Sequence, residues 1–232
     1  MNPQKRFIIV GAGTICPGDL DFKMNPGDFL CAADAGYLTL EKAGLTPDLV
    51  VGDFDSMEAP EIPPANGKAP EILRLPVEKD DTDTVFCVKE GFRRGYTDFL
   101  LLGALGGKRL SHTLANLQLL TVVRDLGGTA LIRQGGTETF LLGAGETRVF
   151  PADDPRQFPD ETASDTRGGS NYPALSVFSL SDEAEISLEG LYYPLDRGII
   201  TRRFPLGVSN HFTGEEARIT VHRGEILIVT ER

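Results

Sequence analysis

Up to about residue 136, short apolar runs alternate with segments whose apolar residues recur at helical spacing. The runs predict strands at Phe7–Val10, Phe29–Ala33, Leu49–Val51, Ile72–Leu75, Phe99–Leu102 and Ala130–Ile132. The periodic segments predict helices at Tyr37–Ala43, Thr84–Arg93 and His112–Leu126, each followed by a glycine that suits a helix C-terminus. Several strands are apolar throughout, as in a sheet covered on both faces. The alternation predicts an α/β unit on a mostly parallel sheet with right-handed crossovers.

Beyond residue 136 the pattern changes to short stretches in which polar and apolar residues often alternate. These stretches are Thr139–Leu142, Thr147–Phe150, Leu175–Leu180, Glu185–Leu188, Arg218–Val221 and Glu225–Val229. They predict an antiparallel β-sandwich or barrel. The segment 151–173 is rich in Pro, Asp, Ser and Gly, which predicts a mobile surface loop. We therefore expect two domains, an α/β domain over residues 1–136 and a β-sandwich over 137–232.

Composition narrows the range of partners. Lys and Arg number 23 against 34 Asp and Glu, a net charge of -11, which disfavours binding to nucleic acid because a phosphate backbone is repelled. No apolar run approaches the roughly 18 residues of a membrane span, and the N-terminus does not read as a signal peptide. The three cysteines lack C-x-x-C spacing and the three histidines lie far apart, so we expect neither zinc nor disulfides, and a cytoplasmic protein.

An acidic turn follows the third predicted strand, where Leu49–Val51 continues into Gly52-Asp53-Phe54-Asp55-Ser56. Alternate residues of an extended chain point the same way, so we expect the carboxylates of Asp53 and Asp55 to converge. Ligands of open α/β sheets bind beyond the carboxyl ends of the strands, and paired carboxylates there suit Mg²⁺. The alternative is a polar turn in which Asp55 or Ser56 caps a following helix.

A second acidic cluster, Glu78-Lys79-Asp80-Asp81-Thr82-Asp83-Thr84, follows the next predicted strand and opens a helix. The structural explanation is that Asp at the N-cap and in the first turn stabilises a helix by about 0.5–2 kcal/mol. One or two aspartates are enough for capping. Three within four positions favour a functional role, for Asp80 and Asp83 more than for Asp81.

A glycine-rich basic loop follows the strand Phe99–Leu102 and reads Gly103-Ala104-Leu105-Gly106-Gly107-Lys108-Arg109-Leu110-Ser111-His112. Glycines let the backbone approach a ligand, and N–H groups at a helix start attract anions. The spacing is not that of a Walker A loop. Gly11-Ala12-Gly13 is either a weak nucleotide signal or a tight turn, and His112 is either a hydrogen-bonding residue at a helix start or a catalytic one. Carboxylates facing a cationic glycine loop predict a nucleoside triphosphate site.

The ordered set of motifs resembles the thiamine pyrophosphokinase (thiamine diphosphokinase) family and spans both halves of the chain. Its members are Ala33-Asp34-Ala35-Gly36, Pro47-Asp48 through Gly52-Asp53-Phe54-Asp55-Ser56, Lys79-Asp80-Asp81-Thr82-Asp83-Thr84, Gly103-Ala104-Leu105-Gly106-Gly107 through His112-Thr113-Leu114-Ala115-Asn116, Gly190-Leu191-Tyr192-Tyr193-Pro194-Leu195 and Gly207-Val208-Ser209-Asn210. The resemblance implies an N-terminal α/β nucleotide-binding domain, a C-terminal β-sandwich and a homodimer with thiamine near the subunit interface. It also implies that the thiamine hydroxyl attacks the β-phosphorus of Mg-ATP, giving thiamine diphosphate and AMP.

The resemblance further implies roles for individual residues. The expected catalytic set is Asp53, Asp55, Asp80 and Asp83, of which Asp53, Asp55 and Asp83 hold Mg²⁺ and the phosphates. The expected ATP contacts are Asp34, Gly103, Gly106, Gly107, Arg109, His112 and Asn116. Ser209 and Asn210 are expected to line the thiamine pocket, and the chain has no Trp, so stacking on thiamine falls to Tyr192, Tyr193 or Phe212.

Two departures from the family pattern and two alternative functions accompany this interpretation. The loop before His112 carries one extra residue, with Ser111 where the family has Asp, so Arg109 matches the family arginine better than Lys108 does. The segment 151–173 is longer than the usual connection. The alternatives are a related pyrophosphokinase that uses another acceptor alcohol, and a non-catalytic nucleotide or thiamine sensor.

Overall fold

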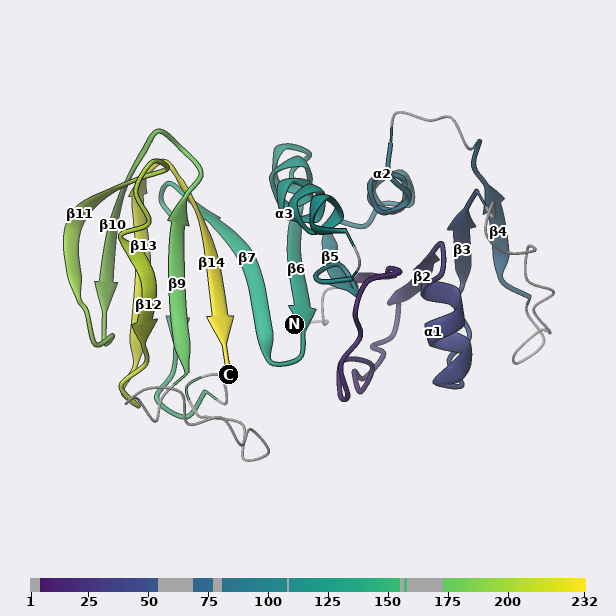
Figure 1. Ribbon diagram of the computed structural model, residues 1–232, viewed down its shortest axis with the longest axis horizontal. Coiled ribbons are helices and arrows are strands. Elements are labelled where there is room, and N and C mark those ends of the chain that lie inside the picture. The colour runs from purple at the N-terminus through teal and green to yellow at the C-terminus, as the bar shows by residue number, and fades with distance from the viewer. Residues whose placement is uncertain (1–4, 54–68, 77–80, 108, 155–156, 158–172) are drawn as a thin grey trace. The chain divides into compact units, whose positions relative to one another are not determined.

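The chain folds into two compact units, Met1–Gly135 and Gly136–Arg232 (Figure 1). The structure, a computed structural model, describes residues 5–53, 69–76, 81–107, 109–154, 157 and 173–232. The predicted Asp55 and Asp80 and most of the predicted loop 151–173 lie outside these residues. Within the described part, an N-terminal α/β unit is followed by a unit of antiparallel strands, as the sequence predicts.

The first unit is a parallel six-stranded sheet with strand order β6-β5-β1-β2-β3-β4. Its strands are β1 (Phe7–Val10), β2 (Phe29–Ala33), β3 (Leu49–Gly52), β4 (Glu71–Arg74), β5 (Asp98–Leu102) and β6 (Thr129–Gln134). Every pairing between neighbours is parallel. All six predicted strands are present, and β1 and β2 agree with the prediction residue for residue.

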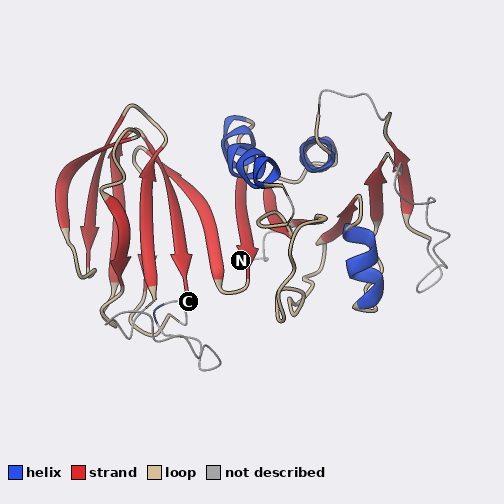
Figure 2. Ribbon diagram, viewed as in Figure 1, coloured by secondary structure: helices blue, strands red, loops and turns tan. Residues whose placement is uncertain are grey.

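In the described part of the unit, three helices pack on this sheet (Figure 2): α1 (Gly36–Lys42), α2 (Asp83–Arg93) and α3 (Leu110–Asp125). The α1 residues Tyr37 and Leu40 join a core with Ile8, Val10 and neighbouring side chains on one face of the sheet. The opposite strand positions point to the other face, where α2 packs against β1, β2 and β3. Gly44, Gly95 and Gly127 follow the three helices in left-handed conformations (φ 70°, 79° and 81°), as the helix-stop prediction requires.

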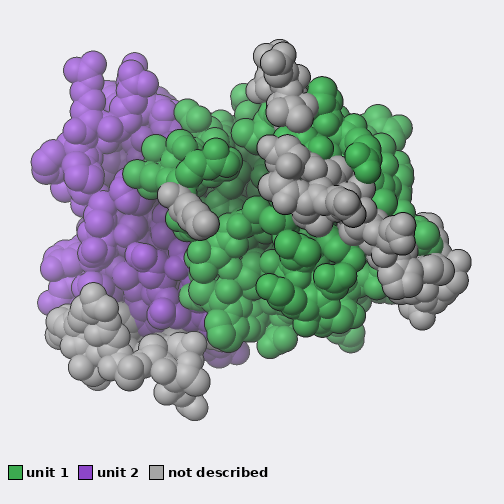
Figure 3. Space-filling model, turned by 45° about the vertical axis from the view of Figure 1, so that its right-hand side comes forward, with its two compact units in different colours: residues 1–135 green, residues 136–232 purple. Residues whose placement is uncertain are grey.

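The second unit, purple in Figure 3, consists in its described residues of two antiparallel arrays, β12-β9-β14-β7 and β11-β10-β13-β8. Its strands are β7 (Thr137–Gly143), β8 (Thr147–Phe150), β9 (Ala174–Ser179), β10 (Glu183–Glu189), β11 (Leu195–Thr201), β12 (Gly207–His211), β13 (Ala217–Arg223) and β14 (Glu225–Glu231). Both arrays contribute to one core, with Phe150, Ile186, Ile219, Ile226 and Phe212 among its buried members. The arrangement is a sandwich whose centre is closed by apolar side chains.

The sequence prediction missed two strands, β11 and β12. Both lie at the edge of their array, where one side has no strand partner among the described residues and many side chains stay exposed. Within β12 the pairing to β9 shifts between Gly207 and Asn210, and Ser209 adopts φ 59°. Such a bulge breaks the alternation of apolar and polar residues by which a strand is recognised.

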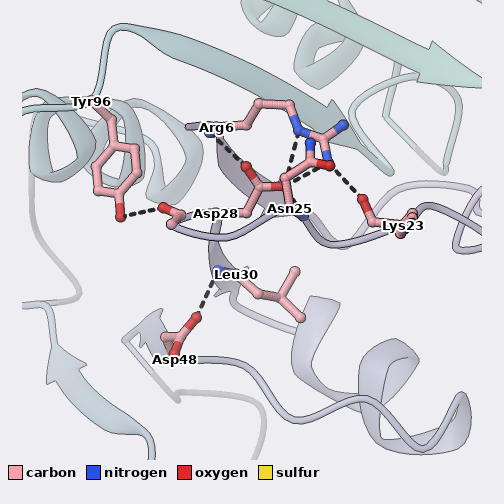
Figure 4. A network of polar contacts seen from close by, with 8 residues as sticks. Arg6, Lys23, Asn25, Asp28, Leu30, Asp48 and Tyr96 are labelled. Carbon is pink, nitrogen blue, oxygen red and sulfur yellow. Dashed lines mark hydrogen bonds and ion pairs between the residues drawn. The ribbon is translucent and has the colours of Figure 1, made fainter. Parts of the chain in front are cut away.

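A polar network holds the amino ends of β1 and β2, at the end of the sheet opposite to the carboxyl ends of the strands (Figure 4). Arg6 donates to Asp28 from its backbone N (2.8 Å), Nε (3.1 Å) and Nη2 (2.6 Å). The Asp48 carboxylate accepts the N–H of Leu30 at 2.9 Å, and the Tyr96 hydroxyl donates to the carbonyl of Gly27 at 3.0 Å. These contacts hold the strands together at their amino ends. Their carboxyl ends, where ligands of such sheets bind, are not used by this network.

Among the described residues, no helix is both long enough and apolar enough to cross a membrane.

Candidate active site

A cavity of about 560 Å³ opens in the first unit at the carboxyl ends of the parallel strands. Loops after β1, β2, β3 and β5 and the amino ends of α2 and α3 form its walls. The lining residues are Ala12, Gly13, Thr14, Ala33, Asp34, Asp53, Thr82, Asp83, Thr84, Gly103, Ala104, Gly106, Gly107, Arg109, His112, Ala115 and Asn116. Within the described residues, five separate segments of the chain meet there, because the loop after β5 continues directly into α3.

Nine of the residues singled out in the sequence lie together in this cavity. They are Asp34, Asp53, Asp83, Gly103, Gly106, Gly107, Arg109, His112 and Asn116. Asp55 and Asp80, which complete the predicted catalytic set, lie outside the described residues. Ser209 and Asn210 belong to the second unit.

The acidic wall is formed by carboxylates from three different elements. Asp34 follows β2, Asp53 follows β3, and Asp83 begins α2. Asp34 adopts φ 51°, a left-handed conformation that Asp tolerates better than most residues, and its N–H donates to the carbonyl of Val51 at 2.7 Å. This hydrogen bond joins the carboxyl ends of β2 and β3 and so fixes the position of Asp34 at the cavity.

At the start of α2, the residues of the second acidic cluster have different partners, which distinguishes structural from functional roles. The N-cap is Thr82, whose hydroxyl accepts the N–H of Val85 at 3.3 Å, so of the structural alternative only the aspartate in the first turn, Asp83, is present and no aspartate provides the cap. Asp81 is turned to Lys89, which donates to its two oxygens at 2.8 and 2.6 Å. Asp83 lies in the first turn and lines the cavity. The cluster thus divides into a cap, an ion pair and a cavity carboxylate.

Among the residues described, no group of three His, Cys, Asp or Glu side chains is arranged to hold a metal ion. The predicted ligand set includes Asp55, which lies outside the described residues. Asp53 and Asp83 supply the hard oxygen donors that Mg²⁺ prefers, and this ion usually takes one or two carboxylates with phosphates and waters. The two described carboxylates fit that requirement.

Another part of the cavity wall is the glycine loop after β5. Gly103, Gly106 and Gly107 all have positive φ (61°, 67° and 84°). The loop packs directly on the segment after β1, because a Cβ placed on Gly13 would lie 2.3 Å from the carbonyl oxygen of Gly103. Gly11-Ala12-Gly13 therefore serves close backbone packing at the cavity, a role that its spacing alone left undecided.

Arg109 and Asn116 complete this wall from α3. Arg109 is the N-cap residue of α3 but makes no side-chain cap, and its charge lines the cavity. Asn116 donates from Nδ2 to the carbonyl of Ala104 at 2.6 Å. That contact gives Asn116 a role in shaping the loop. Lys108 lies outside the described residues.

The predicted thiamine residues occupy an edge of the second unit. Ser209 is exposed, whereas Asn210 is only 4% exposed and uses both ends of its amide on the backbone of Tyr193. Tyr192 and Tyr193 are more than half exposed and meet edge to face with ring centroids 4.8 Å apart. Phe212 is wrong as a stacking candidate, because it is 1% exposed and packs against Phe150 in the core.

Two family models match the chain. The model for the thiamin pyrophosphokinase catalytic domain matches residues 23–128, and the model for the thiamin pyrophosphokinase vitamin B1 binding domain matches residues 164–226. Together they cover most of the chain. The first match includes every cavity residue after β2 begins, while Ala12, Gly13 and Thr14 precede it.

Solved structures with the same fold come from bacteria and yeasts. Thiamine pyrophosphokinase from Bacillus subtilis superposes with a TM-score of 0.77 at 20% identity, covering 98% of this chain and 99% of the other. Thiamin pyrophosphokinase from Geobacillus thermodenitrificans superposes with a TM-score of 0.74 at 23% identity, covering 98% of this chain and 97% of the other. That of Candida albicans gives a TM-score of 0.72 at 17% identity, covering 98% of this chain and 89% of the other. At these identities the likeness establishes the fold. A search of curated protein sequences gave no match.

Proposed function

The chain belongs to the thiamin pyrophosphokinase family, and from this premise we propose which of its residues bind ATP, magnesium and thiamine. Its function is to transfer the pyrophosphoryl group of ATP to the hydroxyl of thiamine. The products are thiamine diphosphate and AMP. We assign ATP to the cavity of the first unit and thiamine to a site that includes Ser209 of the second.

The observation that carries the assignment of ATP is that carboxylates and a glycine-rich loop with an arginine line the same cavity. Asp53 and Asp83 supply the carboxylates, and the loop Gly103–Gly107 with Arg109 supplies the backbone N–H groups and the positive charge. A triphosphate needs positive neighbours, which the net charge of -11 does not supply over the surface as a whole. Arg109 and the N–H groups at the start of α3 supply them locally.

Pyrophosphoryl transfer depends on positioning and charge neutralisation more than on covalent help from the protein. Asp53 and Asp83, with Asp55 as a third ligand, would hold Mg²⁺, which offsets phosphate charge when bound. Arg109 stabilises the charge that develops on the departing AMP. Asp80 helps to orient the attacking hydroxyl. Asp34 and the glycine loop fix the nucleotide.

In the second unit, we propose that exposed side chains contact thiamine and that the buried Asn210 holds them in position. Ser209 presents its side chain to solvent on the bulge of β12. Tyr192 and Tyr193 offer ring faces for the cationic thiazolium, a favourable pairing for aromatic rings. Asn210 holds Tyr193 in place through its two hydrogen bonds.

Homodimer formation and a cytoplasmic location also belong to the proposal. The second unit exposes large apolar side chains, including Tyr192, Phe204 and Leu206, each more than half exposed, which is typical of a surface that a partner covers. The three cysteines are free, which suits a reducing compartment. Light scattering of the purified protein tests the dimer.

The decisive experiment incubates purified protein with Mg-ATP and thiamine and separates nucleotides and thiamine esters by chromatography. Equimolar AMP and thiamine diphosphate are expected. ADP with thiamine monophosphate would mean a different phosphoryl transfer. If no product formed while ATP stayed bound, a panel of other alcohols, such as hydroxymethyl pterins and pyrimidines, would distinguish another acceptor from a sensor.

A further inference from the structure

Thr14, in the segment between β1 and β2, holds the glycine loop at two points. Its backbone N–H donates to the carbonyl of Leu105 at 3.3 Å, and its Oγ1 accepts the N–H of Gly107 at 3.1 Å. The two contacts lie on either side of Gly106. A Cβ on Gly106 would approach Thr14 Oγ1 to 3.0 Å, so the residue and the loop fit closely.

The same loop has four consecutive carbonyl groups that each accept a hydrogen bond from elsewhere in the first unit. The donors to Gly103, Ala104, Leu105 and Gly106 are, in order, the Gly13 N–H (2.8 Å), Asn116 Nδ2 (2.6 Å), the Thr14 N–H (3.3 Å) and Thr113 Oγ1 (3.3 Å). A carbonyl oxygen facing the cavity would repel a phosphate. Tying all four to protein donors orients the loop for an anion.

Thr14 differs from the other donors because it alone contacts the loop through both its backbone and its side chain. It also lines the cavity and is exposed there. Its hydroxyl has one proton and two lone pairs, of which the Gly107 contact uses a lone pair. The proton stays available to a ligand in the cavity.

We propose that Thr14 is a positioning residue for the triphosphate of ATP, acting by clamping Leu105–Gly107 in its anion-binding conformation. The inference rests on the proposed placement of ATP in this cavity. It concerns a residue outside the segment 23–128 that matches the catalytic-domain model. Loss of the hydroxyl frees the Gly107 N–H and lets the loop sample conformations in which a carbonyl faces the phosphates.

The test compares Thr14→Val, which keeps the shape and removes the hydroxyl, with Thr14→Ser, which restores it. Thr14→Val is expected to raise the KM for ATP roughly 3- to 10-fold, the equivalent of one lost hydrogen bond, and to leave the KM for thiamine unchanged. Thr14→Ser should restore the ATP value. Thr121→Val is the matched control, because Thr121 donates within α3 to Gln118 at 2.6 Å and does not line the cavity.

A second readout is amide hydrogen exchange at Gly107, measured by NMR without substrate. Exchange should be faster in Thr14→Val and normal in Thr14→Ser. Thr14→Ala serves if the valine variant does not fold. An unchanged KM for ATP overturns the proposal, whether or not exchange at Gly107 changes, because the clamp then has no effect on the nucleotide.

The proposed function and this inference fail in distinguishable ways. If the wild-type protein forms no thiamine diphosphate, calorimetric titration of ATP still measures the affinity of each variant. Weaker ATP binding by Thr14→Val alone then supports the clamp while the reaction is rejected. Equal ATP binding by all variants rejects the clamp while product formation upholds the reaction.

Discussion

The side-chain amide of Asn210 pairs with the backbone of Tyr193 as a strand would. Its Oδ1 accepts the Tyr193 N–H at 2.9 Å, and its Nδ2 donates to the Tyr193 carbonyl at 2.8 Å. The Oδ1 also accepts the N–H of His211 at 2.9 Å. A buried side chain of β12 thus fixes the segment that carries the two exposed tyrosines.

Asn210→Ala is expected to lower the free energy of unfolding by about 1–3 kcal/mol, because it leaves backbone groups of Tyr193 without partners. It should also raise the KM for thiamine and leave that for ATP unchanged. Urea unfolding and steady-state kinetics measure the two effects. Ser209→Ala is the companion variant. It should raise the KM for thiamine without loss of stability, because Ser209 is proposed to contact thiamine whereas Asn210 supports the fold around the site. Stability equal to wild type in Asn210→Ala would contradict the anchoring role.

Asp83→Asn is expected to reduce kcat by roughly 100-fold or more, because it removes a cavity carboxylate that neutralises charge through Mg²⁺. The loss of stability should stay below about 1 kcal/mol, the value of a charge at a helix start. Asp53→Asn should behave alike. Asp81→Asn is the control two residues away, since Asp81 pairs with Lys89 at the surface, and it should turn over normally. Near-normal turnover of Asp83→Asn at saturating Mg²⁺ would exclude Asp83 from the catalytic set.

Arg109→Ala is expected to raise the KM for ATP by roughly 10-fold or more, and that for thiamine much less, because charged hydrogen bonds to phosphate are lost. The helix should tolerate the change, since Arg109 provides no side-chain cap. Arg202→Ala, at an exposed ion pair with Asp182, is the control. A larger effect on thiamine than on ATP would place the loop on the acceptor side.

The Arg6–Asp28 pair predicts part of the acid sensitivity of the fold (Figure 4). Burial alone would raise the pKa of Asp28, but hydrogen bonds from Arg6 and from the backbone of Asn25 outweigh it and lower the pKa below its usual 3.8. The unfolded chain therefore binds the proton more readily. The stabilisation is complete above the usual value and is lost as the pH falls through the folded-state pKa.

Asp28→Asn is accordingly expected to cost about 1.5–3 kcal/mol at neutral pH and to make the loss of stability on acidification shallower. Urea unfolding at a series of pH values measures both. Asp182→Asn, whose carboxylate is 80% exposed, should leave the profile unchanged. An acid profile for Asp28→Asn parallel to that of wild type would mean that other groups control it.

The three cysteines are expected to react at very different rates. Cys31 and Cys87 are both 0% exposed with sulfurs 3.5 Å apart, and burial raises the pKa of the Cys31 thiol well above its usual value. The thiolate is the reactive form, so a thiol reagent should label only Cys16 in the folded protein at neutral pH. Mass spectrometry counts the labels, and urea should expose all three. Rapid native labelling in Cys16→Ser would show that the α2–β2 contact opens readily.

Much of the first unit could be predicted because each signal is local. A strand covered on both faces must be apolar along its whole length, so β1 and β2 are visible residue for residue. Helix ends are equally local, since a left-handed residue such as Gly44 is required at the stop. Asp34, Asp53 and the glycine loop from Gly103 lie directly after such strands, and the fixed direction of a parallel sheet brings them to the same end of it.

The supporting roles of Thr14 and Asn210 could not be predicted from the sequence, which placed Asn210 in the thiamine pocket and gave Thr14 no role, because these roles depend on partners elsewhere in the chain. Thr14 meets Gly107 across 93 positions, and Asn210 meets Tyr193 across an edge strand that itself escaped prediction. In the sequence, a single threonine or asparagine looks the same whether it caps a helix, contacts a ligand or supports a loop. Only the partner atom distinguishes these roles.

The sequence by itself determined the α/β-then-β order, the family and the residues that gather at the cavity, because hydrophobic periodicity and motif order are properties of the chain. Tertiary structure alone decided which of the neighbouring polar residues does what. Thr82 caps α2, Asp81 pairs with Lys89, and Asp83 faces the cavity, although the three are consecutive. Successive residues at a helix start point in different directions, and the surrounding elements determine what each one meets.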